Sequence, residues 1–366
     1  MSSPSVHRVP ERFREWVEPL DAARPISVLC HNDVDGLAAG ALLTRALRRR
    51  GFTVVVETTG KGEHAWHPAV RERLQRAAPQ ALLVADLGSR AEPVLPGVPT
   101  LLIDHHRPDG LPPDAVLLSG YGSDPVPTSG LLAYWACAAI APIDDLDWIA
   151  AISLLGDIGD DAPFAILDEA RRRWKITPLR DATALLNAPR RSAAGDARPA
   201  LDLLLRARDP REVTRGDHPE VARLKAAKAE VNAAFAAAKQ ASPRFSGTVA
   251  MIWIHSACQV HPLIAQIWRT WLATYIVMAV NSGYLPGRVN FSVRAGKGTN
   301  VLEFLREHAP AEAGDAYGHG HDQASGGSLP YAQWNELAQG LGFGPDMLVD
   351  VPHAASPAQP SSPGAP

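Results

Sequence analysis

The sequence is poor in cysteine, with three in 366 residues, at the widely separated positions Cys30, Cys137 and Cys258. No two of them form the CxxC pair that is typical of thiolate zinc sites, and three separated thiols do not make a disulfide framework. The sequence therefore excludes a small disulfide-held scaffold. We expect the three cysteines to be buried as small apolar side chains.

Long apolar runs are also absent, since no window approaches the roughly eighteen uninterrupted apolar residues of a membrane-spanning helix. Residues 1–14 carry charges throughout, where a secretory signal would have an apolar segment. We therefore expect a cytoplasmic protein with no membrane partner. A content of 46% hydrophobic and 20% charged residues is ordinary for a chain of this length with two buried cores.

The chain lacks a strong charge of either sign, because its net charge is −3. This value argues against a protein that coats DNA through bulk positive charge. Residues 165–245 are locally basic, with 17 Lys/Arg against 10 Asp/Glu. A solvated helix surface explains such a stretch, because scattered arginines often serve solubility alone. A groove that faces phosphates is the alternative.

Short apolar runs alternate with helical segments in the first part of the chain. The run Ile26–Cys30 is followed by a polar stretch and then by apolar residues at helical spacing that end near Gly51. Further apolar runs lie at 53–57, 81–88 and 100–106. Continuous apolar strands that alternate with helices predict an α/β fold with a doubly wound, mainly parallel sheet.

A second, smaller α/β unit is expected after a helical connector. Its predicted strands are 248–254, 274–280 and 288–295, with a helix at 262–272. The last residues, rich in Pro, Ser and Ala, lack the apolar side chains that offset the entropy of ordering. We predict a first domain at 1–215, a connector at 216–245, a second domain at 246–345 and a disordered tail at 351–366.

Acidic residues and histidines gather where the predicted strands end. They are His31, Asp33, Asp35, Asp86, Asp104, His105 and His106, together with Asp157 in a later glycine-containing segment. Open α/β sheets place their sites at the carboxyl ends of the strands. A set rich in carboxylates, with few histidines and no cysteine, suits a hard cation, and the imidazoles favour Mn²⁺ over Mg²⁺. The sequence therefore predicts a metal centre, with Mn²⁺ first and Mg²⁺ as the alternative.

These segments carry a family resemblance. HNDVDG, VADLG, IDHHRP and LLGDIGDD resemble, in this order, the four motifs of the DHH phosphoesterases. FSVRA (291–295) and GHGHDQASGG (318–327) are similar to the DHH-associated C-terminal domain, so the resemblance extends over residues 27–329. His319 stands where the family usually has glycine, which leaves open how closely a substrate approaches this segment.

The resemblance implies a centre with two metal ions. His31, Asp33 and Asp86 would hold one ion, and the other would be held by Asp35, Asp86, His105 and Asp157. Asp86 would then bridge the pair. Two cations about 3.5–4 Å apart can activate a shared water and neutralise the charge that develops on a phosphoryl group.

The resemblance also implies residues that act on the substrate. His106 would contact the scissile phosphate, where an imidazolium can assist the leaving oxygen, and Asp104 would orient a neighbouring histidine. In the second domain, Arg294 would make a forked contact to a phosphate. Backbone amides in a glycine turn formed by Gly318, Gly320 and His321 would cradle another phosphate.

Three substrate classes compete within this family. Short oligonucleotides and linear or cyclic dinucleotides are the substrates of the nano-RNase type, long single strands are those of RecJ, and some members hydrolyse pyrophosphate. RecJ usually carries an additional oligonucleotide-binding domain, for which no strands remain unassigned here, so we rank short nucleotides before long strands. The glycine-histidine motif resembles that of the nucleotide-cleaving members, so pyrophosphate ranks third. A non-catalytic nucleotide-binding module is the alternative of another kind. The sequence leaves open the choice between RNA and DNA, the polarity of cleavage and whether the protein is a homodimer.

Overall fold

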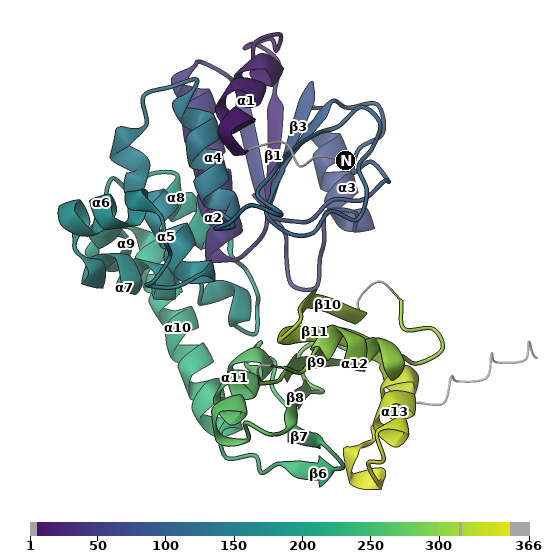
Figure 1. Cartoon of the computed structure of the whole chain (residues 1–366). Helices are drawn as coiled ribbons and strands as arrows, with labels where there is room; N and C mark the ends of the chain where they lie inside the picture. Colours follow the sequence, from purple (N-terminus) through teal and green to yellow (C-terminus); the bar gives the residue numbers. More distant parts are fainter. Residues whose placement is uncertain (1–5, 297, 315–316, 352–366) are drawn as a thin grey trace, which may run out of the picture. The chain divides into compact units, whose positions relative to one another are not determined.

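A computed structural model describes residues 6–296, 298–314 and 317–351, with all their side chains except those of His319 and His321. The chain forms two compact units, Met1–Ala233 and Ala234–Pro366 (Figure 1). Their boundary falls within helix α10 (Pro219–Ala238), which lies in the predicted connector. Of the predicted disordered tail, everything beyond Val351 is outside the described residues.

The first unit is built on a five-stranded sheet in which every neighbouring pair is parallel. The strands, in sheet order, are β2 (Val54–Thr58), β1 (Ile26–Cys30), β3 (Ala81–Ala85), β4 (Thr100–Asp104) and β5 (Val116–Ser119). The order reverses between β1 and β3, and such a switch point is where open α/β sheets bind ligands. This sheet confirms the predicted fold class.

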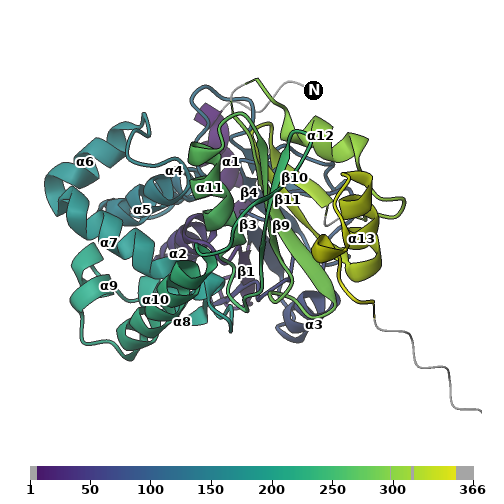
Figure 2. The ribbon, with the colours of Figure 1, turned by 90° about the horizontal axis from the view of Figure 1, so that it is seen from below.

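Helices cover both faces of this sheet, as a doubly wound fold requires. Alternate strand residues such as Val28 and Leu83 face a large core with α1 (Val9–Val17), α2 (Val34–Arg49), α4 (Ser129–Ala138) and α5 (Asp147–Asp157). Their neighbours Leu29 and Leu82 face a smaller core with α3 (Pro68–Arg76). Figures 1 and 2 show α2 and α3 on opposite sides of the sheet. The sheet is therefore buried on both sides, which explains why its strands are apolar without alternation.

Two strands are shorter than the sequence predicts, and both end where the candidate site begins. The run 81–88 is a strand only to Ala85, because Asp86 adopts a left-handed backbone with φ of +62°. The run 100–106 ends as a strand at Asp104. Strand β5 was not foreseen, since four residues with two half-buried positions give a weak pattern.

The basic stretch folds into short helices: α6 (Ala165–Trp174), α7 (Ile176–Leu186), the 3₁₀ turn η3 (Pro189–Arg191), α8 (Arg198–Leu204) and α9 (Pro210–Arg215). Several of its arginines form ion pairs with acidic residues close by in the chain. The pairs are Arg171–Asp168, Arg180–Asp160, Arg198–Asp202, Arg206–Glu220 and Arg208–Glu212. The local excess of positive charge is therefore partly neutralised, as expected of a solvated helix surface.

The second unit contains a six-stranded mixed sheet. In sheet order its strands are β10 (Tyr317–His321), β11 (Ala324–Pro330), β9 (Arg288–Arg294), β8 (Ile276–Asn281), β7 (Val249–Ile254) and β6 (Arg244–Ser246). Only β7 and β8 pair in parallel. The described residues of this unit also form α11 (His261–Trp271), α12 (Val301–Glu307), α13 (Tyr331–Gly340) and the 3₁₀ turn η4 (Pro345–Met347). The fully buried Trp334 packs here against Phe291 and Trp253.

The structure corrects the expectation of a glycine turn in the segment that contains Gly318, Gly320 and His321. The segment is not a glycine turn but strand β10, which pairs antiparallel with β11 and carries a register shift between Tyr317 and His319. Gly318 lies within this shift with φ of +75°, a conformation that glycine adopts without strain. At Gly320, a Cβ would collide with the carbonyl oxygen of Ala324 on the paired strand. The glycines therefore permit a bulge and a close strand pairing.

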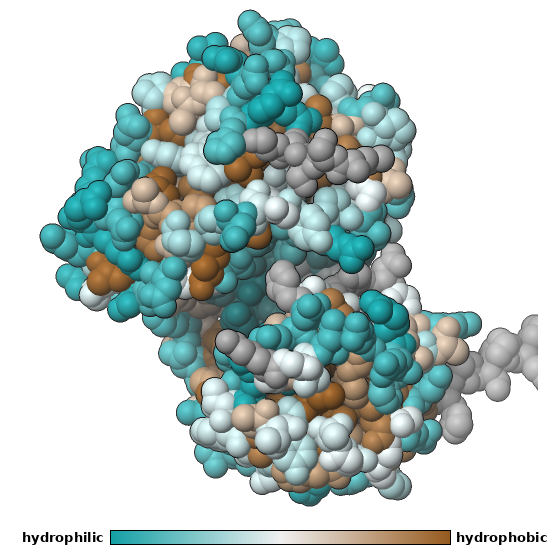
Figure 3. Space-filling view, viewed as in Figure 1, coloured by the Kyte–Doolittle hydropathy of each residue, from teal (hydrophilic) through white to brown (hydrophobic). Residues whose placement is uncertain are grey.

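The three cysteines are placed as the sequence predicts. Cys30, Cys137 and Cys258 are buried and form no disulfide. None of the helices in the described part of the chain combines the length and apolar character needed to cross a membrane. Hydrophilic residues cover most of the face seen in Figure 3.

Candidate metal centre

The sheet brings the predicted site residues to one edge. Cys30 at the end of β1 is level with Ala85 at the end of β3, so the residues that follow them, His31 and Asp86, emerge side by side. Backbone hydrogen bonds extend this alignment, from His31 N to Ala85 O at 3.0 Å and from Asp86 N to Ile103 O at 3.0 Å. The site therefore lies at the switch point of the sheet.

One group of potential metal ligands consists of His31, Asp33 and Asp86, whose donor atoms lie within 4.8 Å of one another. His31 Nδ1 is 3.1 Å from Asp33 Oδ2 and 3.4 Å from Asp86 Oδ2. Asp33 is also the N-cap of α2, where its Oδ1 accepts a hydrogen bond from Gly36 N at 3.1 Å. The helix start thus fixes one carboxylate of the group.

A second group consists of Asp35, His105 and Asp157, again within 4.8 Å. Asp35 lies in the first turn of α2 and Asp157 ends α5. His105 joins them, with Nδ1 3.7 Å from Asp157 Oδ2 and Nε2 3.9 Å from Asp35 Oδ2. Its Nε2 is also 3.6 Å from Asp86 Oδ1. Asp86 therefore stands between the two groups, where a shared ligand would stand.

The backbone at Asp86 is unusual. Its φ of +62° places a non-glycine residue in the left-handed region, which aspartate enters more readily than most side chains but still at a cost. Such strain is common at functional sites. Here it ends strand β3 and leaves a buried carboxylate, 4% exposed, facing both groups.

The electrostatics of the cluster show that it suits a cation. Burial and repulsion by Asp86 and Asp157 raise the pKa of Asp35 well above its usual range. Burial and repulsion by Asp33 raise the pKa of Asp86. Burial alone would lower the pKa of His31, yet the charge of Asp33 raises it to about 10. Each shift reports negative charge crowded away from water, a condition that bound cations relieve.

Asp104 and His106 form a separate pair beside the groups. Asp104 Oδ1 lies 2.9 Å from His106 Nδ1, while Asp104 Oδ2 accepts a hydrogen bond from Gly88 N. Burial would lower the pKa of His106, but the hydrogen bond and the charge of Asp104 raise it to about 9. Asp104 is placed to orient His106, whose side chain is 47% exposed. The donor atoms of Asp86, His105 and His106 also lie within 4.8 Å, so His106 is close enough to serve as a ligand as well.

Sequence reasoning missed Ser129, at the start of α4. Its Oγ donates to Asp86 Oδ1 at 2.9 Å, and its backbone N donates to Asp35 Oδ2 at 2.9 Å. Gly130 N donates to Asp35 Oδ1 at 2.7 Å. The segment PTSG does carry the signal of a helix start, since Thr128 is the N-cap. Nothing in that signal connects it with acidic residues about 43 and 94 positions away.

Ser129→Ala is expected to weaken binding of a divalent cation at this cluster by about 10–100-fold, the range found when a residue that orients a metal ligand is lost. The variant keeps the two backbone hydrogen bonds to Asp35 and removes only the one to Asp86. Ser153→Ala is the matched control, because Ser153 is equally buried and its hydroxyl pairs with Thr128 Oγ1. Calorimetric Mn²⁺ titrations of both variants measure the difference, and equal losses in the two would contradict this role for Ser129.

The site residues expected in the second unit lie on its sheet. Arg294 ends β9, and its Nη1 donates to Ser292 Oγ at 2.9 Å and to the Val293 carbonyl at 2.9 Å. Burial lowers its pKa. Gly318 and Gly320 belong to β10. The side chain of His321 is outside the described part of the chain, so its role stays a prediction.

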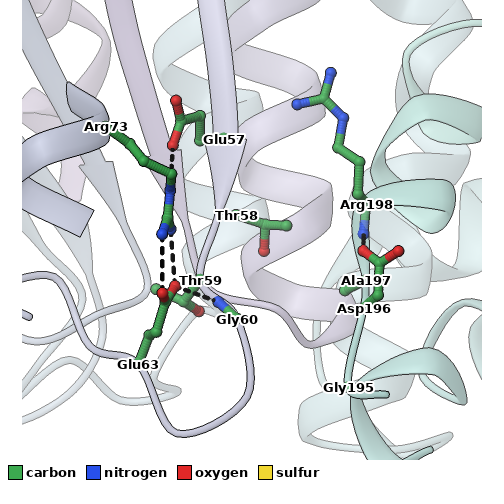
Figure 4. Close-up of a pocket in the computed structure, with 10 residues that line it drawn as sticks. All are labelled: Glu57, Thr58, Thr59, Gly60, Glu63, Arg73, Gly195, Asp196, Ala197 and Arg198. Atoms are coloured by element: carbon green, nitrogen blue, oxygen red, sulfur yellow. Dashed lines mark hydrogen bonds and ion pairs between the residues drawn. The ribbon is translucent and has the colours of Figure 1, made fainter. Parts of the chain in front are cut away.

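A pocket of about 330 Å³, whose wall includes several charged residues, lies at the carboxyl end of β2 (Figure 4). Both arginines in its wall are already engaged. Arg73 binds Glu57 at 3.0 Å and Glu63 at 2.8 Å, as the dashed lines in Figure 4 show. Arg198 binds Asp202 at 2.8 Å and the Val56 carbonyl at 2.9 Å. The pocket therefore has little cationic capacity for a phosphate, and the acidic cluster remains the better candidate site.

Comparison with known proteins gives no match to a family model and none to a curated protein. Solved structures do match. RecJ from Thermus thermophilus in complex with Mn²⁺ superposes with a TM-score of 0.69 and 19% identity, over 93% of this chain and 55% of that one. An exonuclease RecJ bound to manganese gives 0.66 and 20%, over 93% of this chain and 95% of that one. The DHH domain of a member of a ribosomal protein family gives 0.65 and 16%, over 92% and 88%.

These identities establish a shared fold and not a shared activity. The chain spans 55% of the Thermus thermophilus RecJ chain. The motifs at the strand ends resemble those of the DHH phosphoesterases, and the structural matches to RecJ and a DHH domain agree with that resemblance. The chain has the two-unit α/β fold of RecJ and the DHH-domain proteins.

Proposed function

We propose that this protein is a metal-dependent phosphodiesterase of the DHH type that acts on short nucleotides. The observation that carries the proposal is the pair of ligand groups that meet at Asp86 on the switch point of the sheet. Buried carboxylates with raised pKa values occupy both groups. Burying these carboxylates without a bound cation would cost free energy. The protein also shares its fold with structures solved with Mn²⁺.

Two Mn²⁺ ions fit the donor chemistry, with Mg²⁺ as the alternative. The first position would be held by His31, Asp33 and Asp86. The second would be held by Asp35, Asp86, His105 and Asp157. When bound, two such ions supply an activated water and neutralise charge on the phosphoryl group. The carboxylates give the hard oxygen ligands that both cations prefer, and the imidazoles favour Mn²⁺.

The chain's own residues perform the remaining tasks. Ser129 and the backbone N of Gly130 hold Asp35 and Asp86 in fixed orientations through the hydrogen bonds described above. Asp104 keeps His106 protonated at Nδ1, so that its half-exposed ring is poised to meet the substrate phosphate and the leaving oxygen. We further propose that Arg294, Gly318, Gly320 and His321 of the second unit bind substrate phosphate.

Short oligonucleotides and linear or cyclic dinucleotides are the favoured substrates. A long strand needs an extended track of cations, and five of the arginines in residues 165–245 are already paired with nearby carboxylates. A RecJ-like exonuclease acting on single strands is the second candidate, because RecJ structures superpose with TM-scores of 0.66–0.69. Pyrophosphate ranks third.

A substrate panel tests the proposal. Protein stripped with EDTA is assayed with added Mn²⁺ or Mg²⁺ on labelled dinucleotides, cyclic dinucleotides, tetranucleotides, a long single strand and pyrophosphate. We expect no turnover without metal, the highest kcat/KM on di- to tetranucleotides, and long-strand activity that falls steeply with salt. Processive degradation of the long strand at moderate salt, with dinucleotides left intact, would reverse the ranking. Absence of Mn²⁺ binding and of turnover on every substrate would refute the enzyme assignment.

A further inference from the structure

Arg190 brings a positive charge to the metal centre from a distant part of the sequence. It lies in the 3₁₀ turn η3 after α7, and its Nη1 is 3.4 Å from Asp33 Oδ2. The side chain is 19% exposed. No motif marks this arginine, which stands among many others in the basic stretch.

The position of Arg190 is fixed by packing of the turn that carries it. Ala188 and Pro189 are buried, and Asn187 Oδ1 accepts a hydrogen bond from Val34 N at 3.3 Å. Val34 is the residue between Asp33 and Asp35 in the first turn of α2. The turn is therefore attached to the same backbone that places two candidate ligands, and the guanidinium is held beside the centre.

Much of the hydrogen-bonding capacity of this guanidinium is unused. Its Nε is buried and has no hydrogen-bond partner within the described residues, and the contact from Nη1 to Asp33 is long. A guanidinium has five N–H donors in a planar fork. Buried donors without partners are costly, so they commonly mark a place where a ligand supplies the acceptors.

The charge balance around Arg190 changes when cations bind. In the metal-free protein Asp33 is its anionic partner. Once Asp33 shares its charge with a cation, Arg190 faces a positive neighbour and needs another anion. A phosphate ester bound at the same centre provides non-bridging oxygens, which arginine binds with several donors at once.

We propose that Arg190 contacts a non-bridging oxygen of the substrate phosphate, in addition to its contact with Asp33. The inference rests on the proposed function, since it takes the metal centre as the place where the phosphate binds. It names a phosphate-binding residue from the α7–α8 region, outside the motifs that predicted the centre. Removing a donor of this kind typically lowers kcat by about 100–1000-fold.

An alternative role for Arg190 makes the opposite prediction for the metal. If the arginine served only to hold Asp33, its loss would weaken Mn²⁺ binding. If it contacts phosphate, its loss removes a positive charge near the cations, so Mn²⁺ should bind equally well or more tightly while phosphate binds more weakly. Metal and phosphate affinities therefore separate the two roles.

The experiment uses the full chain with Arg190→Gln and Arg190→Lys. Arg180→Gln is the control, because Arg180 lies on α7 and forms an exposed ion pair with Asp160. Calorimetry measures Mn²⁺ binding, then binding of inorganic phosphate and of AMP to the Mn²⁺-loaded proteins, and melting curves check folding. We expect Arg190→Gln to bind both anions at least 10-fold more weakly with Mn²⁺ affinity retained. Arg190→Lys should recover part of the loss, and Arg180→Gln should match the wild type.

Two results would overturn the inference. One is loss of Mn²⁺ affinity in Arg190→Gln with anion binding to the loaded protein unchanged. The other is wild-type values for both. If Arg190→Gln does not fold, the same measurements on Arg190→Lys decide, because wild-type anion binding with a lysine of shorter reach would also count against a contact from the guanidinium to the phosphate. Wild-type protein that binds anions through Arg190 but cleaves no diester would refute the proposed function alone, whereas normal diester cleavage by Arg190→Gln would refute this inference alone.

Discussion

Asp86→Asn is expected to remove at least one of the two proposed Mn²⁺ ions and to lower kcat/KM by about 1000-fold or more. Asp86 is the residue that faces both ligand groups, so its neutral analogue weakens both. A loss of roughly 4 kcal/mol of charge stabilisation corresponds to about three orders of magnitude in rate. Mn²⁺ stoichiometry by calorimetry and steady-state kinetics on a dinucleotide measure the two effects.

The same variant should remain folded. Asparagine tolerates the left-handed conformation of Asp86 and keeps an oxygen that can accept the hydrogen bond from Ser129 Oγ. In the absence of metal we expect it to melt at a higher temperature than the wild type, because burial and repulsion by Asp33 disfavour the carboxylate. Added Mn²⁺ should then raise the melting temperature of the wild type more than that of the variant.

Asp145→Asn is the matched control for Asp86→Asn. Asp145 forms an ion pair with Arg49 near the opposite end of α5 from Asp157, and its side chain is 53% exposed. It should keep both Mn²⁺ ions and full activity. Wild-type turnover by Asp86→Asn would remove the basis for placing the metal centre at this edge of the sheet.

The features that could be predicted from the sequence are those that depend on residues close together in the chain. The acidic and histidine clusters were found because each directly follows an apolar strand or ends an apolar helix, and parallel strands must bring their carboxyl ends together. The strand order places β1 beside β3, and this adjacency joins His31 to Asp86. Fold class and candidate ligands were therefore accessible from local pattern and one general rule of α/β sheets.

Features that depend on contacts between residues far apart in the chain could not be predicted from the sequence. Ser129 and Arg190 contact the cluster across 43 and 157 residues of chain, and neither has a neighbour in sequence that suggests acidic partners. Strands β10 and β11 were missed for another reason. Their segment is rich in glycine, which gives no alternating pattern, and the pairing of β11 with β9 through seven residue pairs determines its conformation.

The requirement for glycine at position 36, the last residue of HNDVDG, arises from a close approach to His31 that the sequence alone does not show. A Cβ at this position would lie 2.5 Å from His31 Cβ, 2.7 Å from the His31 carbonyl oxygen and 2.8 Å from its Cα. Two of these atoms are backbone, so no rotation of a side chain relieves the contact. Glycine is required here because α2 begins directly against the end of β1.

Gly36→Ala is therefore expected to force His31 and the start of α2 apart. Overpacking of this kind costs about 1–3 kcal/mol, which lowers the melting temperature by several degrees in a unit of this size. A displacement of about 1 Å in a catalytic group can cost about 100-fold in rate. Asp33 and Asp35 both lie at the start of α2 and belong to different ligand groups, so we expect both Mn²⁺ positions to weaken.

Gly340→Ala is the matched control, since a Cβ there meets no atom within 4 Å and the residue ends helix α13. Alanine favours a helix over glycine by up to about 1 kcal/mol, so this variant should be as stable as the wild type or slightly more stable, with unchanged activity. Melting curves and Mn²⁺ titrations of both variants give the comparison. If Gly36→Ala matches Gly340→Ala in melting temperature, in Mn²⁺ stoichiometry and in kcat, then α2 does not hold His31 and Asp33 in the way described.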